Sequence, residues 1–254
     1  MTTPLIRAKD VQISFGGVIA ADNVCLDVLD REKLAIIGPN GAGKTTFLNI
    51  CTGYIKPTRG SVYFQEKEIT GMPPRMITRL GIARTFQIPQ LFLEHTVMEN
   101  MLLALSAHHR KFTTFTPMAD IPEREEAAHI LKLVRISEDA NRLASILPEG
   151  VRKLLDIAMG LALKPSALLM DEPTSGVSSQ EKFEIMDILV EALNERQVTS
   201  VFVEHDMEVV SRYADRVAVW DAGQIRMVGT PLEVLNHPDV IDRVIGIGGS
   251  HAAL

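Results

Sequence analysis

The nine residues from 38 to 46 constrain this chain more than any other stretch. They read Gly-Pro-Asn-Gly-Ala-Gly-Lys-Thr-Thr. The apolar run at 34–37 predicts a buried strand before them, and residues 46–50 predict a helix after them. Glycines at this spacing let backbone N–H groups turn inward at the positive end of a new helix, where phosphate binds. A glycine-rich turn without a ligand does not require the Lys-Thr ending, so the stretch is predicted to hold a nucleotide polyphosphate.

Two side chains at the end of this stretch have predicted roles of their own. Lys44 is expected to reach the β- and γ-phosphates, and the hydroxyl of Thr45 is expected to hold Mg²⁺. The predicted nucleotide-binding residues of the loop are Gly38, Pro39, Asn40, Gly41, Ala42, Gly43, Lys44, Thr45 and Thr46.

Composition limits the remaining possibilities. The chain has 254 residues, 46% of them hydrophobic, which is enough for one substantial core with or without a small subdomain. The net charge of −6 argues against broad nucleic-acid binding. The two cysteines, Cys25 and Cys51, lie in apolar stretches and are predicted to be packed thiols of a reducing compartment. Because no signal segment or membrane-spanning run is recognisable, we expect a cytoplasmic protein that reaches a membrane only through a partner.

Hydrophobic patterning predicts an α/β chain with a helical insertion. Strands are predicted at 5–15, 24–29, 60–64 and 82–86, with a helix at 73–80. From about 88 to 151 the pattern becomes helical, with helices at 96–107, 122–135 and 137–146. Strands then return at 167–170 and 199–203, around an amphipathic helix at 182–193. A hairpin at 216–220 and 224–228, one or two short helices within 231–246 and a loose tail complete the chain.

Two adjacent acids, Asp171 and Glu172, stand at the end of a buried apolar run, and Pro173 ends the strand there. Burying both carboxylates is costly without a cation or hydrogen-bond partners. We therefore predict that Asp171 orients Mg²⁺ and that Glu172 polarises an attacking water. The alternative is a solvated turn.

Further polar or aromatic residues occupy comparable positions. Gln87 is the first polar residue after the strand at 82–86, and His205 follows the strand at 199–203 as a candidate γ-phosphate contact. Phe15, upstream of the loop, either stacks on an adenine ring or packs in the core; on residue type alone, packing is favoured.

With the glycine loop, Gln87, Asp171-Glu172-Pro173 and His205 in this order, the chain resembles the nucleotide-binding subunit of an ABC transporter over essentially its whole length. The resemblance implies a P-loop NTPase (RecA-like) core of mixed sheet, an N-terminal antiparallel β subdomain and an inserted α-helical subdomain. We expect a single domain at 1–254, with the core and β subdomain at 1–87 and 152–235, the helical subdomain at 88–151, and a short C-terminal helix and tail at 236–254.

The resemblance also implies roles for the residues. Residues 38–46 match the Walker A motif, Met170 to Pro173 match Walker B with its catalytic Glu172, and Gln87 falls at the Q-loop, where it helps to set the metal and the water. His205 matches the switch histidine. Phe15 falls where the family places its adenine-stacking aromatic, which favours stacking over packing. The implied activity is ATP hydrolysis, with ATP and Mg²⁺ bound, at the cytoplasmic face of the inner (plasma) membrane.

Finer features resemble the subgroup that imports branched-chain amino acids. They are Phe15-Gly16-Gly17-Val18, the stretch 81–87, Val203 to Met207 and Asn236 to Ile241. Partners implied by the resemblance are two transmembrane permease subunits, a second ATP-binding subunit and a solute-binding protein. Ile88, Leu91 and Phe92 are candidates for contact with a permease helix, although burial in the insertion would explain them equally well.

One motif departs from the family pattern. Leu-Ser-Gly-Gly-Gln is usual before the helix that leads to Walker B, whereas this chain has Leu147-Pro148-Glu149-Gly150-Val151. Pro148 offers no hydroxyl and no N–H, and Glu149 places a negative charge near an anion. The next motif is also altered, with Gly176-Val177-Ser178 in place of Gly-Leu-Asp. We therefore expect a heterodimer with an ATPase that has an intact signature; the alternative is a tolerated variant in a homodimer.

Other functions remain possible for this sequence. One alternative is that the same kind of cassette serves the import of urea, amides or carboxylic acids. A soluble, non-transport ABC ATPase usually has two cassettes or a long coiled coil, neither of which is recognisable here. A regulatory cassette that binds ATP without hydrolysing it is disfavoured by Glu172 and His205, and an exporter or lipid-handling cassette is the last alternative.

Overall fold

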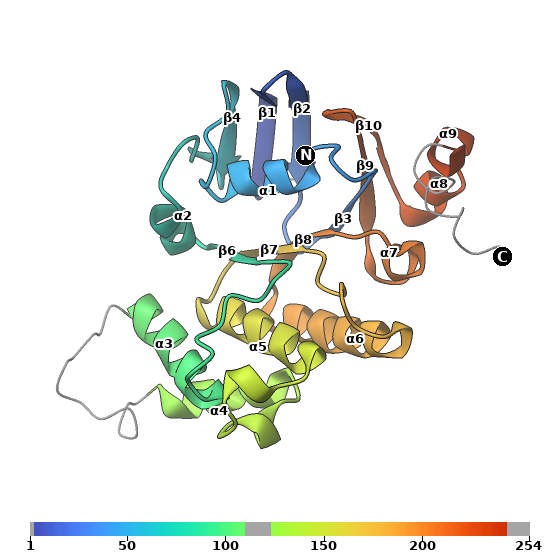
Figure 1. The fold of residues 1–254 in the computed structure, drawn as a ribbon. Coiled ribbons are helices and arrows are strands. Elements are labelled where there is room, and N and C mark those ends of the chain that lie inside the picture. Colours follow the sequence, from blue (N-terminus) through green and yellow to red (C-terminus); the bar gives the residue numbers. More distant parts are fainter. Residues whose placement is uncertain (1–2, 110–122, 243–254) are drawn as a thin grey trace. The chain divides into compact units, whose positions relative to one another are not determined.

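The computed structural model describes residues 3–109 and 123–242 (Figure 1). The chain divides into two compact units, each described separately below. The first unit combines residues 1–77 with residues 199–254, and the second consists of residues 78–198.

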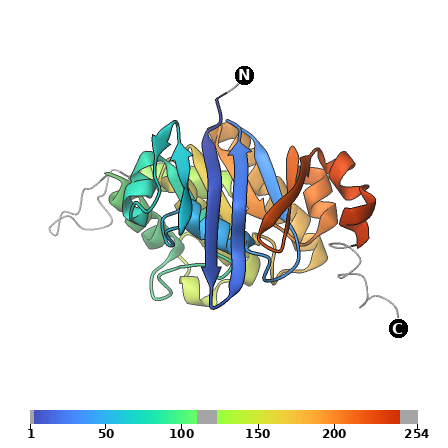
Figure 2. The same ribbon diagram turned by 90° about the horizontal axis from the view of Figure 1, so that it is seen from above.

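An antiparallel sheet forms the N-terminal part of the first unit. Its strand order is β2-β1-β4-β5, and Figure 2 shows β1 and β2 paired side by side. The bounds are Ile6–Phe15 for β1, Val18–Val28 for β2, Arg59–Phe64 for β4 and Lys67–Glu68 for β5. The alternating positions Ile6 and Ala8, then Val11 and Ile13, are buried, which is typical of a sheet with one face on the core.

A mixed sheet forms the rest of the first unit's core. Its strands are β3 (Lys33–Ile37), β8 (Thr199–Val203), β9 (Arg216–Asp221) and β10 (Gln224–Gly229). β3 lies parallel to both β8 and β9, and β10 pairs antiparallel with β9. β8 is buried throughout, and β3 nearly so, as expected for central parallel strands covered on both faces. The helices of this unit include α1 (Lys44–Cys51), α7 (Met207–Tyr213), α8 (Pro231–Leu235) and α9 (Pro238–Val240).

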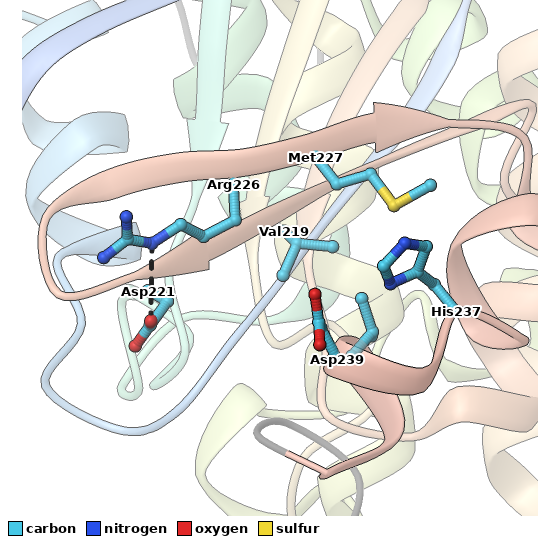
Figure 3. Close-up of a pocket in the computed structure, with 7 residues that line it drawn as sticks. Val219, Asp221, Arg226, Met227, His237 and Asp239 are labelled. Atoms are coloured by element: carbon cyan, nitrogen blue, oxygen red, sulfur yellow. Dashed lines mark ion pairs between the residues drawn. The ribbon is translucent and has the colours of Figure 1, made fainter.

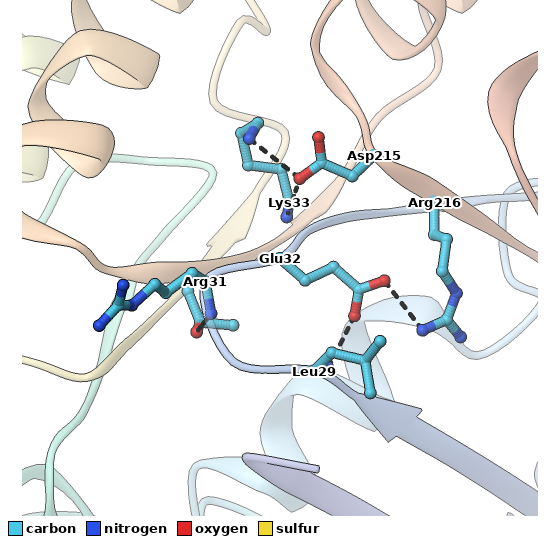
Figure 4. A network of polar contacts seen from close by, with 7 residues as sticks. Leu29, Arg31, Glu32, Lys33, Asp215 and Arg216 are labelled. Atoms are coloured by element: carbon cyan, nitrogen blue, oxygen red, sulfur yellow. Dashed lines mark hydrogen bonds and ion pairs between the residues drawn. The ribbon is translucent and has the colours of Figure 1, made fainter. Parts of the chain in front are cut away.

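A polar network fastens the amino ends of β3 and β9 (Figure 4). Glu32 accepts the N–H of Leu29 at 2.7 Å, and Arg216 Nη1 lies 2.9 Å from its other carboxylate oxygen. That second contact is an ion pair without hydrogen-bond geometry. Lys33 donates its backbone N–H and its ammonium to Asp215, both at 2.9 Å. Burial raises the pKa of Glu32 despite these contacts. This network lies at the amino ends of the two strands, away from the loop that follows the carboxyl end of β3.

The second unit places helices around a pair of parallel strands, β6 (Ile82–Thr85) and β7 (Ala167–Asp171). Helix α5 (Glu149–Ala162) is central, because it contacts α3 (Val97–His109), α4 (Arg124–Leu133), α6 (Ser179–Arg196) and β6. Helix α2 (Pro74–Leu80) leads into this unit from the first. Every residue of β7 is buried.

The sequence predictions of the elements are largely confirmed, with three corrections. Residues 137–146 do not form one helix: the 3₁₀ turns η2 (Ser137–Asp139) and η3 (Ala144–Ile146) flank an extended residue, Leu143, that pairs with Thr96. The second correction concerns the core-facing side of α6, predicted at Phe183, Met186, Leu189, Val190 and Leu193. Met186, Leu189 and Leu193 are buried as predicted, but Ile185 and Ile188 are buried as well, and Phe183 and Val190 are only half-buried.

The third correction concerns a thiol. Cys51 is buried as predicted, but Cys25 is exposed and exchanges hydrogen bonds with Asp10. The subdomain bounds 88–151 and 236–254 remain predictions, and the predicted tail lies outside the described residues from 243 onward. Within residues 3–109 and 123–242, no helix has the length and apolar character needed to cross a membrane.

Candidate functional site

The loop between β3 and α1 has the backbone that the glycine spacing predicts. A Cβ at Gly38 would lie 1.9 Å from the carbonyl oxygen of Trp220, and a Cβ at Gly43 would lie 1.9 Å from that of Ala20. Both glycines have positive φ angles, of 152° and 114°. The loop therefore closes tightly onto β9 and β2 only because these two positions lack side chains.

Helix α1 begins in this loop with its N-terminal charge uncompensated. Its N-cap is Gly43, no side chain caps it, and its first turn contains no acidic residue. Lys44 is 6% exposed, and its ammonium donates to the carbonyls of Gly38 and Pro39 at 2.7 and 2.9 Å. Thr45 is exposed. Backbone N–H groups, a helix dipole and a fixed ammonium together form a site for a polyphosphate.

His205 lies at the same edge of the first unit's sheet. Ile36 and Val203 are partners in the parallel register of β3 and β8, so both strands end together and lead to the phosphate loop and to His205. Asp206 then caps α7 by accepting the N–H groups of Glu208 and Val209. His205 is exposed beside this fixed helix start, where a loop side chain can meet a ligand.

Phe15, in the same unit, ends β1 at the β1–β2 turn. It is 47% exposed, and its neighbours Val18 and Ile19 are exposed as well. The core-packing interpretation of Phe15 is therefore wrong. An exposed ring beside two exposed aliphatic side chains is suited to stacking on a planar ligand.

The second unit holds the acidic residues. Asp171 ends β7 and forms an ion pair with Arg84 of β6 at 3.2 Å, and both side chains are buried. Arg84 therefore gives the Asp171 carboxylate a positively charged partner within the protein, and the role of Asp171 in orienting Mg²⁺ stays a prediction. Glu172 follows with a φ of +50°, which is a left-handed backbone that is costly for a residue with a Cβ. Its carboxylate accepts a hydrogen bond from Gln87 Nε2 at 2.8 Å, so Gln87 and Glu172 are brought together within this unit.

Two buried charges on α5 were missed by sequence reasoning. Lys153 Nζ donates to the carbonyls of Gln87 and Glu172, and Asp156 accepts the N–H of Phe86. Burial raises the pKa of Asp156 to about 6, although backbone N–H groups and Lys153 oppose the shift. Charges three residues apart in a run of Leu, Ile and Ala were the available signal, because an apolar helix face tolerates them only with partners.

A model of the ABC transporter family matches residues 21–175. The chain belongs to the ABC transporter family. The match includes the loop 38–46, Gln87 and Asp171-Glu172 and ends before His205; the roles expected for these four sites stay predictions. The chain is therefore an ATP-hydrolysing, nucleotide-binding ABC subunit, of a kind that works with membrane permease partners.

Full-length relatives carry names from one branch of the family. The chain is 38% identical to a high-affinity branched-chain amino acid transport ATP-binding protein, LivG, of Salmonella typhimurium, covering 97% of this chain and 99% of the relative. It is 36% identical to the corresponding protein BraF of Pseudomonas aeruginosa, with the same coverage.

Solved structures agree on the ABC fold. MJ1267, an ATP-binding cassette of an ABC transporter in its ADP conformation, superposes with a TM-score of 0.85 at 33% identity, over 96% of this chain and 100% of that one. CbiO1 from Clostridium perfringens, part of the transporter complex cbiONQ, gives 0.81 at 26% identity, over 99% and 100%. The predicted ABC fold class is confirmed.

The altered ABC signature forms the start of α5. Pro148 is the N-cap and supplies no side-chain hydrogen bond, and Glu149 lies in the first turn. Arg152 secures this end by donating to the carbonyls of Ala144 and Ser145. In the stretch Gly176-Val177-Ser178, Ser178 has a structural role, because it caps α6 in a reciprocal capping box with Glu181.

A separate cavity of about 390 Å³ lies in the first unit between β9, β10 and α9 (Figure 3). Val219, Met227 and His237 surround it, and Arg226 pairs with Asp221 at 3.4 Å at one end. None of the residues that the sequence predicted for the nucleotide site lines this cavity.

Proposed function

We propose that this chain is the ATP-hydrolysing subunit of an importer for branched-chain amino acids, and that it drives transport through partner permeases at the cytoplasmic face of the plasma membrane. The observation that carries the proposal is the 36–38% identity to LivG and BraF across 97% of this chain. The solute itself is selected elsewhere in such a complex, so the proposal concerns the transport system rather than a solute pocket here.

The proposed reaction is an in-line attack of water on the γ-phosphate. Glu172 takes the proton of the water, whose oxygen bonds to the γ-phosphorus as the bond to the bridging oxygen breaks and ADP leaves. Lys44 and the loop N–H groups stabilise the charge that develops on the phosphates. Gln87 orients the water, His205 contacts the γ-phosphate, and Phe15 stacks on the adenine.

The donor set also fits Mg²⁺. Thr45, Gln87 and Asp171 offer a hydroxyl, an amide oxygen and a carboxylate, which are the hard oxygen ligands that Mg²⁺ takes alongside substrate phosphates. Among the described residues, no group of three or more His, Cys, Asp or Glu side chains forms a metal cage. Bound by Thr45, Gln87 and Asp171, Mg²⁺ supplies neutralising charge to the phosphates.

The permease contact is proposed for an apolar surface of the second unit. Ile88 is 75% exposed and Phe92 is 54% exposed, which favours docking over burial in the helical region. Leu93, Leu143 and Ile146 are exposed as well, and the backbone of Ser145 donates to Leu93 at 3.1 Å, so these segments adjoin. Exposed apolar side chains gathered in this way typically mark an interaction surface. We call these five residues the apolar docking surface.

The second ATP-binding subunit is proposed to be a different protein. In the family, the signature loop closes over ATP held by the opposite subunit. Pro148 gives α5 no side-chain hydrogen bond at its N-terminus, and Glu149 adds negative charge to the first turn. Both features weaken that end as an anion site. A partner with an intact signature would complete the site built on Lys44 and Glu172.

Transport assays test the solute class. Cells lacking this gene should lose uptake of labelled leucine and valine at low concentration and recover it with the wild-type gene. Uptake of urea, short amides and carboxylic acids serves as the parallel measurement. Loss of one of these in place of leucine would assign the cassette to that import system, and normal uptake of all of them would contradict a role in import.

A further inference from the structure

Helix α5 carries two charged residues that are buried in the second unit. Lys153 is 4% exposed and Asp156 is 9% exposed. They are three residues apart, so they lie on the same face of the helix. Burying charge is costly unless partners satisfy it. Each side chain must therefore meet polar groups inside this unit.

Their partners are the backbone of the Q-loop and the end of Walker B. The Lys153 ammonium donates to the Gln87 carbonyl at 3.2 Å, the Glu172 carbonyl at 3.3 Å and Ser175 Oγ at 3.2 Å. Asp156 accepts the N–H of Phe86 at 3.2 Å. Helix α5 thereby holds two consecutive residues, because Asp156 binds the N–H of Phe86 and Lys153 binds the carbonyl of Gln87.

The contact with the Glu172 carbonyl has a specific consequence. Glu172 adopts a left-handed backbone with a φ of +50°, a conformation that is strained for a residue with a Cβ. Such strain persists only where the surroundings fix it, and it is concentrated at functional sites. A charge-assisted hydrogen bond from a buried ammonium is a restraint of that kind.

The side chains above this backbone are linked as well. Gln87 Nε2 donates to Glu172 Oε2 at 2.8 Å. One ammonium thus holds the backbone of both partners in this hydrogen bond, so a shift of Lys153 would move the amide and the carboxylate relative to each other.

We propose that Lys153 is a positioning residue for ATP hydrolysis: its ammonium ties the Gln87 and Glu172 carbonyls together and so places the carboxylate that accepts the proton of water. The inference rests on the proposed role of Glu172 as the base. Lys153 acts through these two residues and exchanges no proton itself.

The test measures ATP turnover by the assembled transport complex. Lys153→Met keeps a side chain of similar length and removes the ammonium. We expect kcat to fall by about 10- to 100-fold, because a misplaced base slows the proton transfer. KM for ATP should change less than about threefold, because nucleotide affinity depends on residues 38–46. Lys153→Arg, which retains donors and charge, should recover much of kcat.

Two controls separate positioning from general destabilisation. Lys164→Met removes a half-exposed ammonium just after α5 that forms an ion pair with Glu126 at 2.9 Å, and it should behave like wild type. The single tryptophan, Trp220, packs on Phe47 beside Gly43. Its fluorescence during ATP titration should give an unchanged Kd for Lys153→Met.

Glu172→Gln completes the experiment. If Glu172→Gln loses ATP turnover while Lys153→Met keeps full turnover, the positioning role of Lys153 is overturned and the proposed base is not. Parallel loss of kcat, ATP affinity and thermal stability in Lys153→Met also overturns it, because that pattern indicates a purely structural lysine. Full turnover in Glu172→Gln contradicts the proposed base itself.

Discussion

Single glycines of Walker A are constrained to different degrees. A Cβ at Gly43 would meet the Ala20 carbonyl oxygen at 1.9 Å, whereas a Cβ at Gly41 meets nothing within 4 Å. Both have positive φ angles, so alanine at either position carries a backbone cost of about 1–3 kcal/mol. At Gly43, unlike Gly41, the added Cβ would also push against Ala20, so β2 would have to move.

We therefore expect Gly43→Ala to weaken ATP binding by at least about tenfold and to lower the melting temperature. The matched variant Gly41→Ala should show the smaller cost of φ strain alone. Tryptophan fluorescence and thermal unfolding of both proteins provide the measurement. Equal affinities in the two variants would mean that the close approach to Ala20 does not shape the loop.

Asp156 makes stability depend on pH. Its pKa is raised from 3.8 to about 6 by burial, so the folded protein holds this proton more tightly than the unfolded chain does. The stabilisation is complete below pH 3.8 and is lost as pH rises through 6, which amounts to about 3 kcal/mol.

Asp156→Asn cannot ionise and should lack this dependence. Between pH 4.5 and pH 7, the unfolding free energy of the variant should improve relative to wild type by about 2 kcal/mol. Urea unfolding at both pH values measures the difference, and the variant's lost hydrogen-bond strength cancels in the comparison. A constant offset between the two proteins would rule out a raised pKa at this position.

Among the elements, the segment after β6 and the turn η3 carry the apolar docking surface, and Phe92 lies in the former. Phe92→Asp places a charge in it, and we expect it to weaken assembly with the permease and to abolish ATP-driven uptake while ATP binding by the isolated subunit is unchanged. Leu232→Asp is the control, because Leu232 is 76% exposed on α8 of the first unit. Co-purification from membranes measures assembly. Normal complex formation by Phe92→Asp would move the permease contact elsewhere.

Elements with strong local signals were predictable from sequence. The strand at 199–203 and the hairpin after residue 215 follow from apolar runs and a glycine turn, and the structure confirms both. Residues 137–146 were not predictable as two 3₁₀ turns, because the pairing of Leu143 with Thr96 is a tertiary contact that overrides helical periodicity.

The residues of the candidate site also divide into those that the sequence predicts and those that depend on tertiary contacts. Residues 38–46 and Asp171-Glu172 are recognisable because their chemistry requires a fixed local spacing. Arg84 and Lys153 act on residues far away in the sequence, at separations of 87 for Asp171 and 66 for Gln87. Spacing within one segment carries no information about such pairs.

At the scale of the whole complex, the altered signature predicts two unequal ATP sites. Glu172→Gln in this chain removes the proposed base of the site that the signature of the proposed partner would complete, and it should reduce uptake by more than about tenfold. The matching Glu→Gln change in the partner subunit affects the site facing Pro148 and should cost much less. Uptake by the two complexes, purified in parallel, measures the asymmetry. Equal losses would favour a homodimer or two equivalent sites.

ATP-driven uptake by reconstituted complex carrying Lys44→Ala tests the mechanism most directly. The ammonium of Lys44 is fixed over the loop by the carbonyls of Gly38 and Pro39, and this substitution removes it while leaving the loop glycines in place. Complex with wild-type subunit should bind ATP in a Mg²⁺-dependent manner and accumulate leucine, and the Lys44→Ala complex should assemble normally but lose both properties. Undiminished leucine uptake by the Lys44→Ala complex would contradict the assignment of this loop as the site whose nucleotide drives transport.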